Sequence, residues 1–413
     1  MNAAAGALSV VLLYGIAHYL SGSSRIAAVT GAGFAVSGGM WLLSTEAESA
    51  TLGLVVGLLV LWLLLAPPAR VADSIWYELL LGLAVSLAVL TYLSGAMLIV
   101  IVASGLLLGD VSRGRSRVKS LIRFAGPVAV ICLPVALATL AYRSWLEWRN
   151  IIWQDDGQGY LAMSWSDGLH GIYAFLRSFG LFVSLALDGG ASALLESAGN
   201  GLKAVFAGYY GLLLAVVLMP FYLAIRRWTQ IMNRWRREVI ILLMWMAGYA
   251  AFAIYWVPGD VTFWLPVLTG WWLLTAIVAK DRMDLAQKKQ AASDRSAVQW
   301  LAIALVTFVL WLKISNGVFT ILPRNDLSSN DAYQLAMEVR SQTSMADLIV
   351  TNSNDIETLY LVYFGRRTVL PVADETPDPD YLEREYADFF SGTAAAGGRN
   401  FLLLDNALIQ LTP

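Results

Sequence analysis

Long apolar runs, separated by short polar or basic segments, occupy the first three quarters of this chain. A helix needs about 20 mostly apolar residues to cross a bilayer. The pattern therefore predicts about ten membrane-spanning helices. Their expected bounds are residues 3–20, 25–43, 50–66, 76–91, 95–108, 124–142, 204–225, 239–256, 262–279 and 297–314.

Beyond residue 314 the chain changes to short alternating runs. Helical patterns are expected at 332–341, 355–364 and 380–390, and strands at 347–350, 368–372 and 401–404. Strands that alternate with helices favour a small parallel α/β layer. The predicted fold is thus a mainly α, polytopic membrane helix bundle over residues 1–314, followed by a small soluble α/β domain over residues 315–413.

Lysine and arginine concentrate in three loops, at 110–122, 226–237 and 280–295. Cytoplasmic loops of membrane proteins are enriched in these residues, so all three loops are expected inside the cell. Counting spans from them places the following segments outside: 44–49, 92–94, 257–261 and the C-terminal domain. The protein is therefore predicted to be a multi-pass protein of the plasma (inner) membrane with an extracytoplasmic C-terminal domain.

The segment 143–203 must begin and end outside by the same count. Its apolar part, 171–187, is therefore expected to be an interfacial or re-entrant helix rather than a simple crossing. The count also puts Met1 outside, as if a first outward-running helix were missing ahead of it.

Composition agrees with a membrane protein. Of 413 residues, 58% are hydrophobic and 14% are charged, whereas soluble domains carry about 25% charged residues. The net charge of −2, with basic residues scattered among loops, argues against a nucleic-acid partner. The single cysteine, Cys132, excludes an intramolecular disulfide and a cysteine-based metal site.

Two carboxylates, Glu46 and Glu48, lie in the outer turn between the second and third predicted spans. Ionisable groups at membrane depth are costly, so such a pair is a candidate site for a cation, a phosphate or a proton. The alternative is structural, because Thr45-x-x-Glu48 fits a capping box at the start of the next helix. One carboxylate can serve in both ways, and both readings stay open.

The outer segment 143–203 offers further candidates. Arg143 and Arg149 flank a Trp-rich run and suit bidentate pairing with phosphate, although Arg and Trp at a span end are also ordinary interfacial anchors. Asp167 and His170 have a spacing that places both on one helical face, but two ligands are too few for a metal site. A solvated loop is the alternative there.

The order of several weak motifs resembles the GT-C superfamily of integral-membrane glycosyltransferases, which includes protein O-mannosyltransferases and lipid A aminoarabinose transferases. The run from Val11 to Ser49 is similar to the family's second and third spans, with Glu48, or Glu46 in an alternative register, at its acidic position. The segment from Tyr255 to Pro266 resembles its late periplasmic hairpin, and Asp347 to Arg367 its C-terminal soluble domain.

This resemblance implies transfer of a sugar from a polyprenyl-phosphate donor to a protein, lipid or glycan acceptor at the outer membrane surface. For such a donor, Glu48 is the candidate ligand of a Mg²⁺ or Mn²⁺ ion that bridges the lipid phosphate, with Glu46 as the second choice, since hard oxygen ligands suit both ions. The predicted donor-binding residues are thus Glu48, Glu46, Arg143, Arg149 and His170.

In the family the catalytic base lies between the first and second spans, a segment without a counterpart in this sequence. No residue is therefore assigned as the base, and an N-terminally truncated enzyme is one expectation. A non-catalytic membrane subunit and a lipid or sugar transporter are the alternatives. A transporter is expected to show repeated halves or broken spans at matching positions, which the sequence does not display.

Overall fold

The structure is a computed structural model and divides into two units. A helical unit comprises Met1–Val183 and Gly189–Thr320, and a small α/β unit comprises Ser184–Asp188 and Ile321–Pro413. The structure describes residues 2–45, 50–67, 74, 76–108, 116–142, 165–180, 200–256, 261–289, 292–318, 331–351, 361–362, 365–371, 391, 393–395, 397–404 and 407–411.

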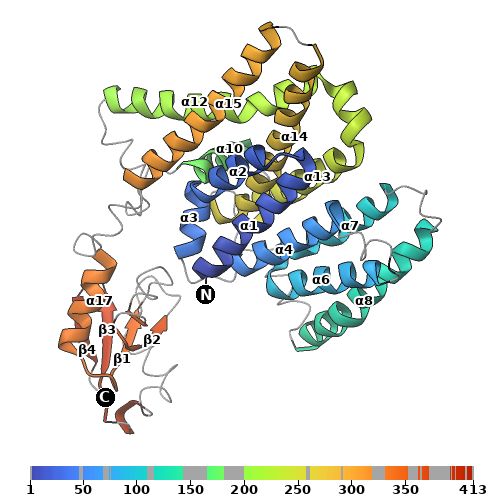
Figure 1. Cartoon of the computed structure of the whole chain (residues 1–413). Coiled ribbons are helices and arrows are strands. Elements are labelled where there is room, and N and C mark those ends of the chain that lie inside the picture. The colour runs from blue at the N-terminus through green and yellow to red at the C-terminus, as the bar shows by residue number, and fades with distance from the viewer. Residues whose placement is uncertain are drawn as a thin grey trace. The chain divides into compact units, whose positions relative to one another are not determined.

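Every predicted span falls on a helix of the helical unit (Figure 1). The elements are α1 (Asn2–Ser21), α2 (Ser24–Ala35), α3 (Gly38–Thr45), α4 (Ala50–Leu65), α6 (Tyr77–Thr91), η1 (Leu93–Ala96), α7 (Met97–Leu108), α8 (Arg117–Tyr142), α10 (Trp165–Phe179), α12 (Asn200–Arg226), α13 (Trp228–Trp256), η3 (Val261–Trp264), α14 (Leu265–Lys289) and α15 (Ala292–Asn316). Among the described residues, five helices are long and apolar enough to cross a membrane, or six if α2 and α3 form one span. This confirms the expected polytopic bundle.

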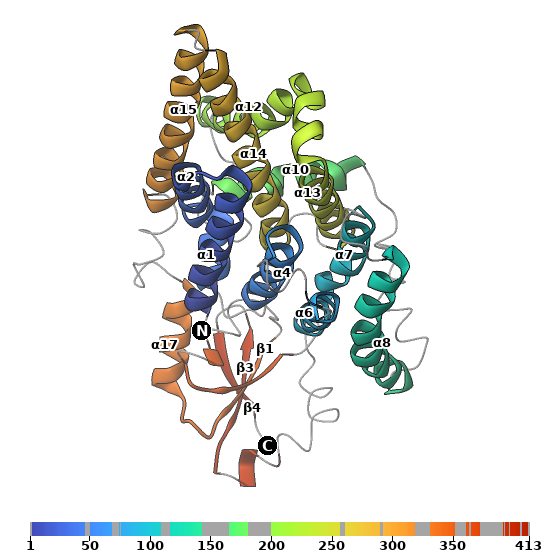
Figure 2. The same cartoon turned by 45° about the vertical axis from the view of Figure 1, so that its right-hand side comes forward.

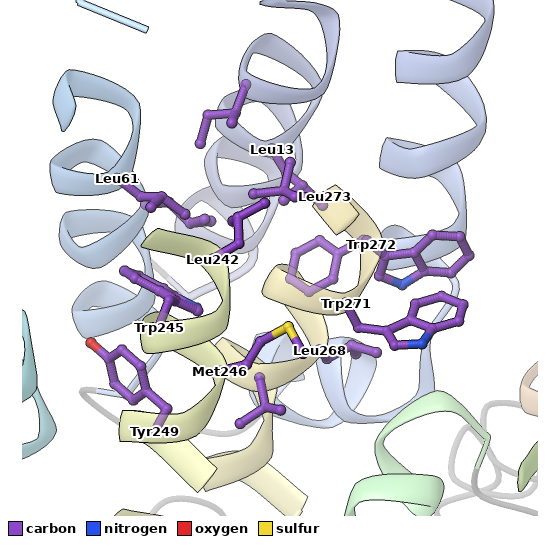
Figure 3. Close-up of a cluster of buried hydrophobic side chains, with 14 of the residues drawn as sticks. Leu13, Leu61, Leu242, Trp245, Met246, Tyr249, Leu268, Trp271, Trp272 and Leu273 are labelled. Carbon is purple, nitrogen blue, oxygen red and sulfur yellow. The ribbon is translucent and has the colours of Figure 1, made fainter. Parts of the chain in front are cut away.

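Helix α14 forms the centre of the helical unit, and 89% of its apolar, membrane-spanning stretch is buried. Its residues Trp271 and Trp272 are completely buried among side chains of neighbouring helices (Figure 3). The indole Nε1 of Trp271 donates to the Val217 carbonyl of α12 at 2.9 Å. Pro220 lies in the same turn of α12 and lacks an N–H group, so the helical hydrogen bonding is interrupted there.

The span expected at 25–43 is broken, which the sequence reading did not anticipate. Helices α2 and α3 meet at an angle of 63°. The break falls at Val36 and Ser37, directly before Gly38 and Gly39, and consecutive glycines disfavour a continuous helix. The Ser37 hydroxyl donates back to the Gly33 carbonyl at 2.8 Å, which closes the end of α2.

Two of the three loops expected inside, 226–237 and 280–295, have described residues in contact at one end of the helical unit. Ion pairs join the α12–α13 junction to the end of α14, where the sequence concentrates its basic residues. They are Arg227–Asp281, Arg234–Asp284 and Lys280–Asp284. Arg237 donates from Nη2 to the Leu64 carbonyl at 2.9 Å, which brings the end of α4 to the same place. The grouping agrees with the predicted sidedness.

The α/β unit contains α17 (Asp331–Gln342), β1 (Leu348–Thr351), β2 (Thr368–Pro371), β3 (Asn400–Leu404) and β4 (Ala407–Leu411). The strand order is β2-β1-β3-β4, and β1 runs parallel to both β2 and β3, as predicted. Figure 1 labels all four strands, and Figure 2 shows the same sheet turned by 45°. Strand β4 pairs antiparallel with β3 and was missed. Of the predicted helices, 380–390 and most of 355–364 lie outside the described residues.

Two buried polar side chains fix α17 to the sheet. Arg367, just before β2, donates from Nη2 to the Arg340 carbonyl at the end of α17 at 2.8 Å. Asp347, just before β1, accepts from the backbone amides of Ser344 at 2.6 Å and Arg399 at 2.7 Å. Burial by itself raises the pKa of Asp347, but these hydrogen bonds outweigh it and hold the pKa below its usual range.

Gly33 and Gly15 provide a matched test of the packing around α14. A Cβ at Gly33 would overlap the buried ring of Trp272, whereas one at Gly15 would meet nothing within 4 Å. We expect Gly33→Ala to lower stability by about 1–3 kcal/mol through overpacking, and Gly15→Ala to raise it by up to about 1 kcal/mol through helix propensity. Thermal unfolding in detergent, followed by tryptophan fluorescence, measures both. Equal midpoints would show that the Gly33–Trp272 contact does not restrain the fold.

Candidate functional site

Turns expected outside meet at the other end of the helical unit. The Thr51 hydroxyl at the start of α4 donates to the Leu43 carbonyl near the end of α3 at 2.8 Å. The ring of Tyr92 stacks on that of Phe263 with 5.9 Å between centroids. A Cβ at Gly53 would lie 2.9 Å from the Tyr92 Cβ, so α4 also touches this turn closely. Residues that flank three turns expected outside thus lie close together, as the predicted sidedness requires.

A small cleft with about 20 Å³ of free space, room for about one water molecule, lies among these turns. Its lining residues are Leu43, Ala50, Gly53, Leu54, Gly57, Tyr92, Ser94, Trp245, Tyr249, Thr262, Phe263, Leu265 and Pro266. Leu43 and Ala50 stand on either side of the acidic turn in the sequence. Glu46 and Glu48 therefore belong to the connection between two lining residues of this cleft.

The wall formed by α13 combines aromatic surface with polar groups. Tyr249 is 4% exposed, and its ring packs against Trp245 with 4.8 Å between centroids (Figure 3). The Trp245 indole Nε1 donates to the Pro266 carbonyl at 2.6 Å, which fixes its orientation. Across the cleft, a Cβ at Gly57 would lie 3.8 Å from the Tyr249 hydroxyl. The cleft is thus lined mostly by apolar and aromatic side chains, with a few hydroxyls among them.

The structure describes only one of the five predicted donor-binding residues. Glu46, Glu48, Arg143 and Arg149 lie outside the described residues, so their roles stay predictions. His170 lies on α10 and is exposed. Helix α10 stands where an interfacial helix was expected at 171–187, but it begins earlier, at Trp165, and ends at Phe179.

Helix α10 packs its other face onto the outer turns. A Cβ at Gly171 would lie 2.8 Å from the ring of Trp264 in η3, and Ala174 is completely buried. Phe179 contacts Trp271 of α14 edge to face, with 4.8 Å between centroids. The helix is thus held against α14 and η3 along one side.

On α10, His170, Tyr173 and Arg177 follow the i, i+3, i+7 spacing that puts side chains on one helical face. We call this set the α10 polar face. The Arg177 guanidinium carbon lies 5.6 Å from the centroid of the Tyr173 ring, which in turn contacts Tyr210 of α12 at 5.0 Å. Within the part of the chain that the structure describes, no carboxylate pairs with Arg177.

A guanidinium without a carboxylate partner suits a phosphate, which it can bind through two parallel hydrogen bonds. The sequence analysis named His170 and missed Arg177. The helical spacing within residues 165–179 was the signal that could have found it.

Solved structures with this fold include two of ArnT, a GT-C glycosyltransferase, from Cupriavidus metallidurans. The structure bound to undecaprenyl phosphate matches with a TM-score of 0.50 and 14% identity, covering 98% of this chain and 79% of ArnT. The apo structure matches with a TM-score of 0.52 and 14% identity, covering 97% and 77%. No model of a protein family and no curated protein matches the chain. The likeness confirms the expected GT-C resemblance at the level of the fold.

Cysteine labelling tests the sidedness of the site. In a Cys132→Ser background, we expect a membrane-impermeant maleimide to label Leu169→Cys on α10 and Met345→Cys in the α/β unit on intact spheroplasts. Trp228→Cys, at the opposite end, should react only after permeabilisation. These side chains are 67%, 71% and 45% exposed in the structure, so each can be reached by the reagent. Labelling of positions 169 and 345 from different sides would contradict the predicted topology.

Proposed function

We propose that this chain is a membrane glycosyltransferase that moves a sugar from a polyprenyl-phosphate donor to an acceptor on the extracytoplasmic face. The observation that carries the proposal is the fold shared with ArnT over 98% of the chain, because that ArnT structure holds undecaprenyl phosphate. The cleft among the outer turns and the α10 polar face support the same function with residues of this chain.

Transfer of this kind forms a bond between an acceptor hydroxyl oxygen and the anomeric carbon of the sugar. The bond between that carbon and the donor phosphate breaks, and the polyprenyl phosphate leaves with the electron pair. The acceptor proton passes to a general base, a role that we assign to no residue of this chain. The α10 polar face supplies positive charge from Arg177 and a hydrogen-bond donor from His170 beside the leaving phosphate.

Divalent-ion binding is a separate part of the proposal. Among the described residues, no three His, Cys, Asp or Glu side chains come together. From the sequence, we propose that an ion would be held by Glu48, with Glu46 as the second candidate, and by phosphate oxygens, as Mg²⁺ and Mn²⁺ commonly are. The ion would neutralise charge on the phosphate, and Arg143 and Arg149 are the further cations proposed for this surface.

The acceptor is left as a protein, lipid or glycan hydroxyl. The cleft has apolar and aromatic walls with the hydroxyls of Tyr249, Ser94 and Thr262 among them. Such walls favour a substrate that carries an apolar chain next to its polar group.

Glu48 is the residue whose substitution most directly tests the site. We expect Glu48→Gln to lower sugar transfer from an undecaprenyl-phosphate donor by about 100-fold, because a misplaced or uncharged group at the reacting centre has effects of that size. Glu338→Gln, an exposed glutamate of α17, serves as the matched control and should leave the rate unchanged. The assay uses the purified chain in liposomes. A Glu48→Gln rate equal to that of the parent would reduce Glu48 to a helix cap.

Arg177 gives a test that needs no catalysis. We expect Arg177→Gln to weaken binding of undecaprenyl phosphate roughly tenfold, the size of one lost charge-assisted hydrogen bond. Binding of undecaprenol, which lacks the phosphate, should not change. Lys203→Gln, an exposed lysine of α12, is the control. Native mass spectrometry of the purified chain measures the binding of both lipids to each variant. If Arg177→Gln weakened the binding of undecaprenyl phosphate and of undecaprenol equally, that would argue against a contact with the phosphate.

A further inference from the structure

The last residue of α15, Asn316, joins two helix ends that are far apart in the sequence. Its side chain is nearly inaccessible, at 1% exposure. Its amide nitrogen Nδ2 donates to the Val36 carbonyl at 2.6 Å and to the Phe179 carbonyl at 3.0 Å. Val36 lies between α2 and α3, and Phe179 is the last residue of α10.

Both carbonyls belong to positions where a helix stops. The final carbonyls of a helix have no donor within the helix, and in apolar surroundings they need one from elsewhere. A side-chain amide carries two N–H groups, so one asparagine can serve two such carbonyls at once. Asn316 thereby connects α15 to the break between α2 and α3 and to the end of α10.

The surroundings show that α3 and α10 are in contact at this point. A Cβ at Gly39 of α3 would lie 3.3 Å from the Ser178 Cα of α10. On the other side, the Ser315 hydroxyl lies 3.4 Å from the Tyr209 hydroxyl of α12. The amide of Asn316 thus lies where four helical segments meet.

Each of the two segments leads to a different part of the proposed site. Glu46 and Glu48 follow α3 directly in the sequence, and α10 carries His170 and Arg177. We infer that Asn316 is a positioning residue, which holds the junction of α2 and α3 and the α10 polar face in a fixed relation by binding the Val36 and Phe179 carbonyls. The inference rests on the proposed function for its catalytic consequence, but not for its structural one.

Hydrogen exchange with mass spectrometry tests the structural consequence without any activity. Asn316→Leu removes both donors and adds no charge. We expect exchange in peptides covering 36–45 and 172–180 to become about tenfold faster, as for the loss of buried hydrogen bonds, while α6 and α8 keep the parent's rates. Ser86→Ala is the matched control, because it removes a buried hydroxyl that bonds only within α6. Parent-like exchange in both peptides would overturn the inference.

A second variant and a second readout complete the test. Asn316→His keeps one N–H donor, so we expect its hydrogen-exchange rates to lie between those of the parent and of Asn316→Leu. This variant keeps the test valid if Asn316→Leu does not fold. In sugar transfer, we expect Asn316→Leu to lower kcat by about 100-fold with little change in the KM for the donor. If the parent transfers no sugar, the proposed function fails and the exchange result still decides the role of Asn316. A parent-like kcat together with faster exchange would overturn the positioning role.

Discussion

Backbone carbonyls that lose their helical partner inside an apolar bundle must find a donor, and this requirement organises the helical unit. Asn316 of α15 supplies such a donor at the ends of α2 and α10. Two tryptophans add bonds to backbone carbonyls of neighbouring helices, Trp271 to Val217 of α12 and Trp245 to Pro266 of α14. These side-chain donors join helices that are distant in the sequence.

The positions of the apolar helices and the grouping of loops were predictable because they depend on local composition. Apolar length marks a span, and clustered Lys and Arg mark an inner loop, so neither needs a distant partner. The break in the second span was missed, although Gly38 and Gly39 signal it. What stabilises the break is Asn316, which is 280 positions from Val36, and no local pattern encodes that pairing.

The site was less predictable for the same reason. His170 stood out as one of two histidines in the chain. Arg177 could be placed on the same helical face only when the bounds of α10, Trp165–Phe179, were known. Tyr249 is one of seventeen tyrosines, and no sequence motif distinguishes it. Its place in the cleft depends on contacts with α4 and η3. Strand β4 was missed because its pairing, rather than its composition, sets it apart.

The position of β1 in the sheet has a consequence for the order of folding. Leu348 pairs with Thr368 on one edge and with Asn400 on the other, so the central strand is enclosed by segments synthesised after it. Phe401 and Leu403, in the later segment, also fill the hydrophobic core beneath α17. The α/β unit therefore reaches its native state only after the chain has been synthesised beyond β3 and β4, and until then β1 keeps an open, aggregation-prone edge.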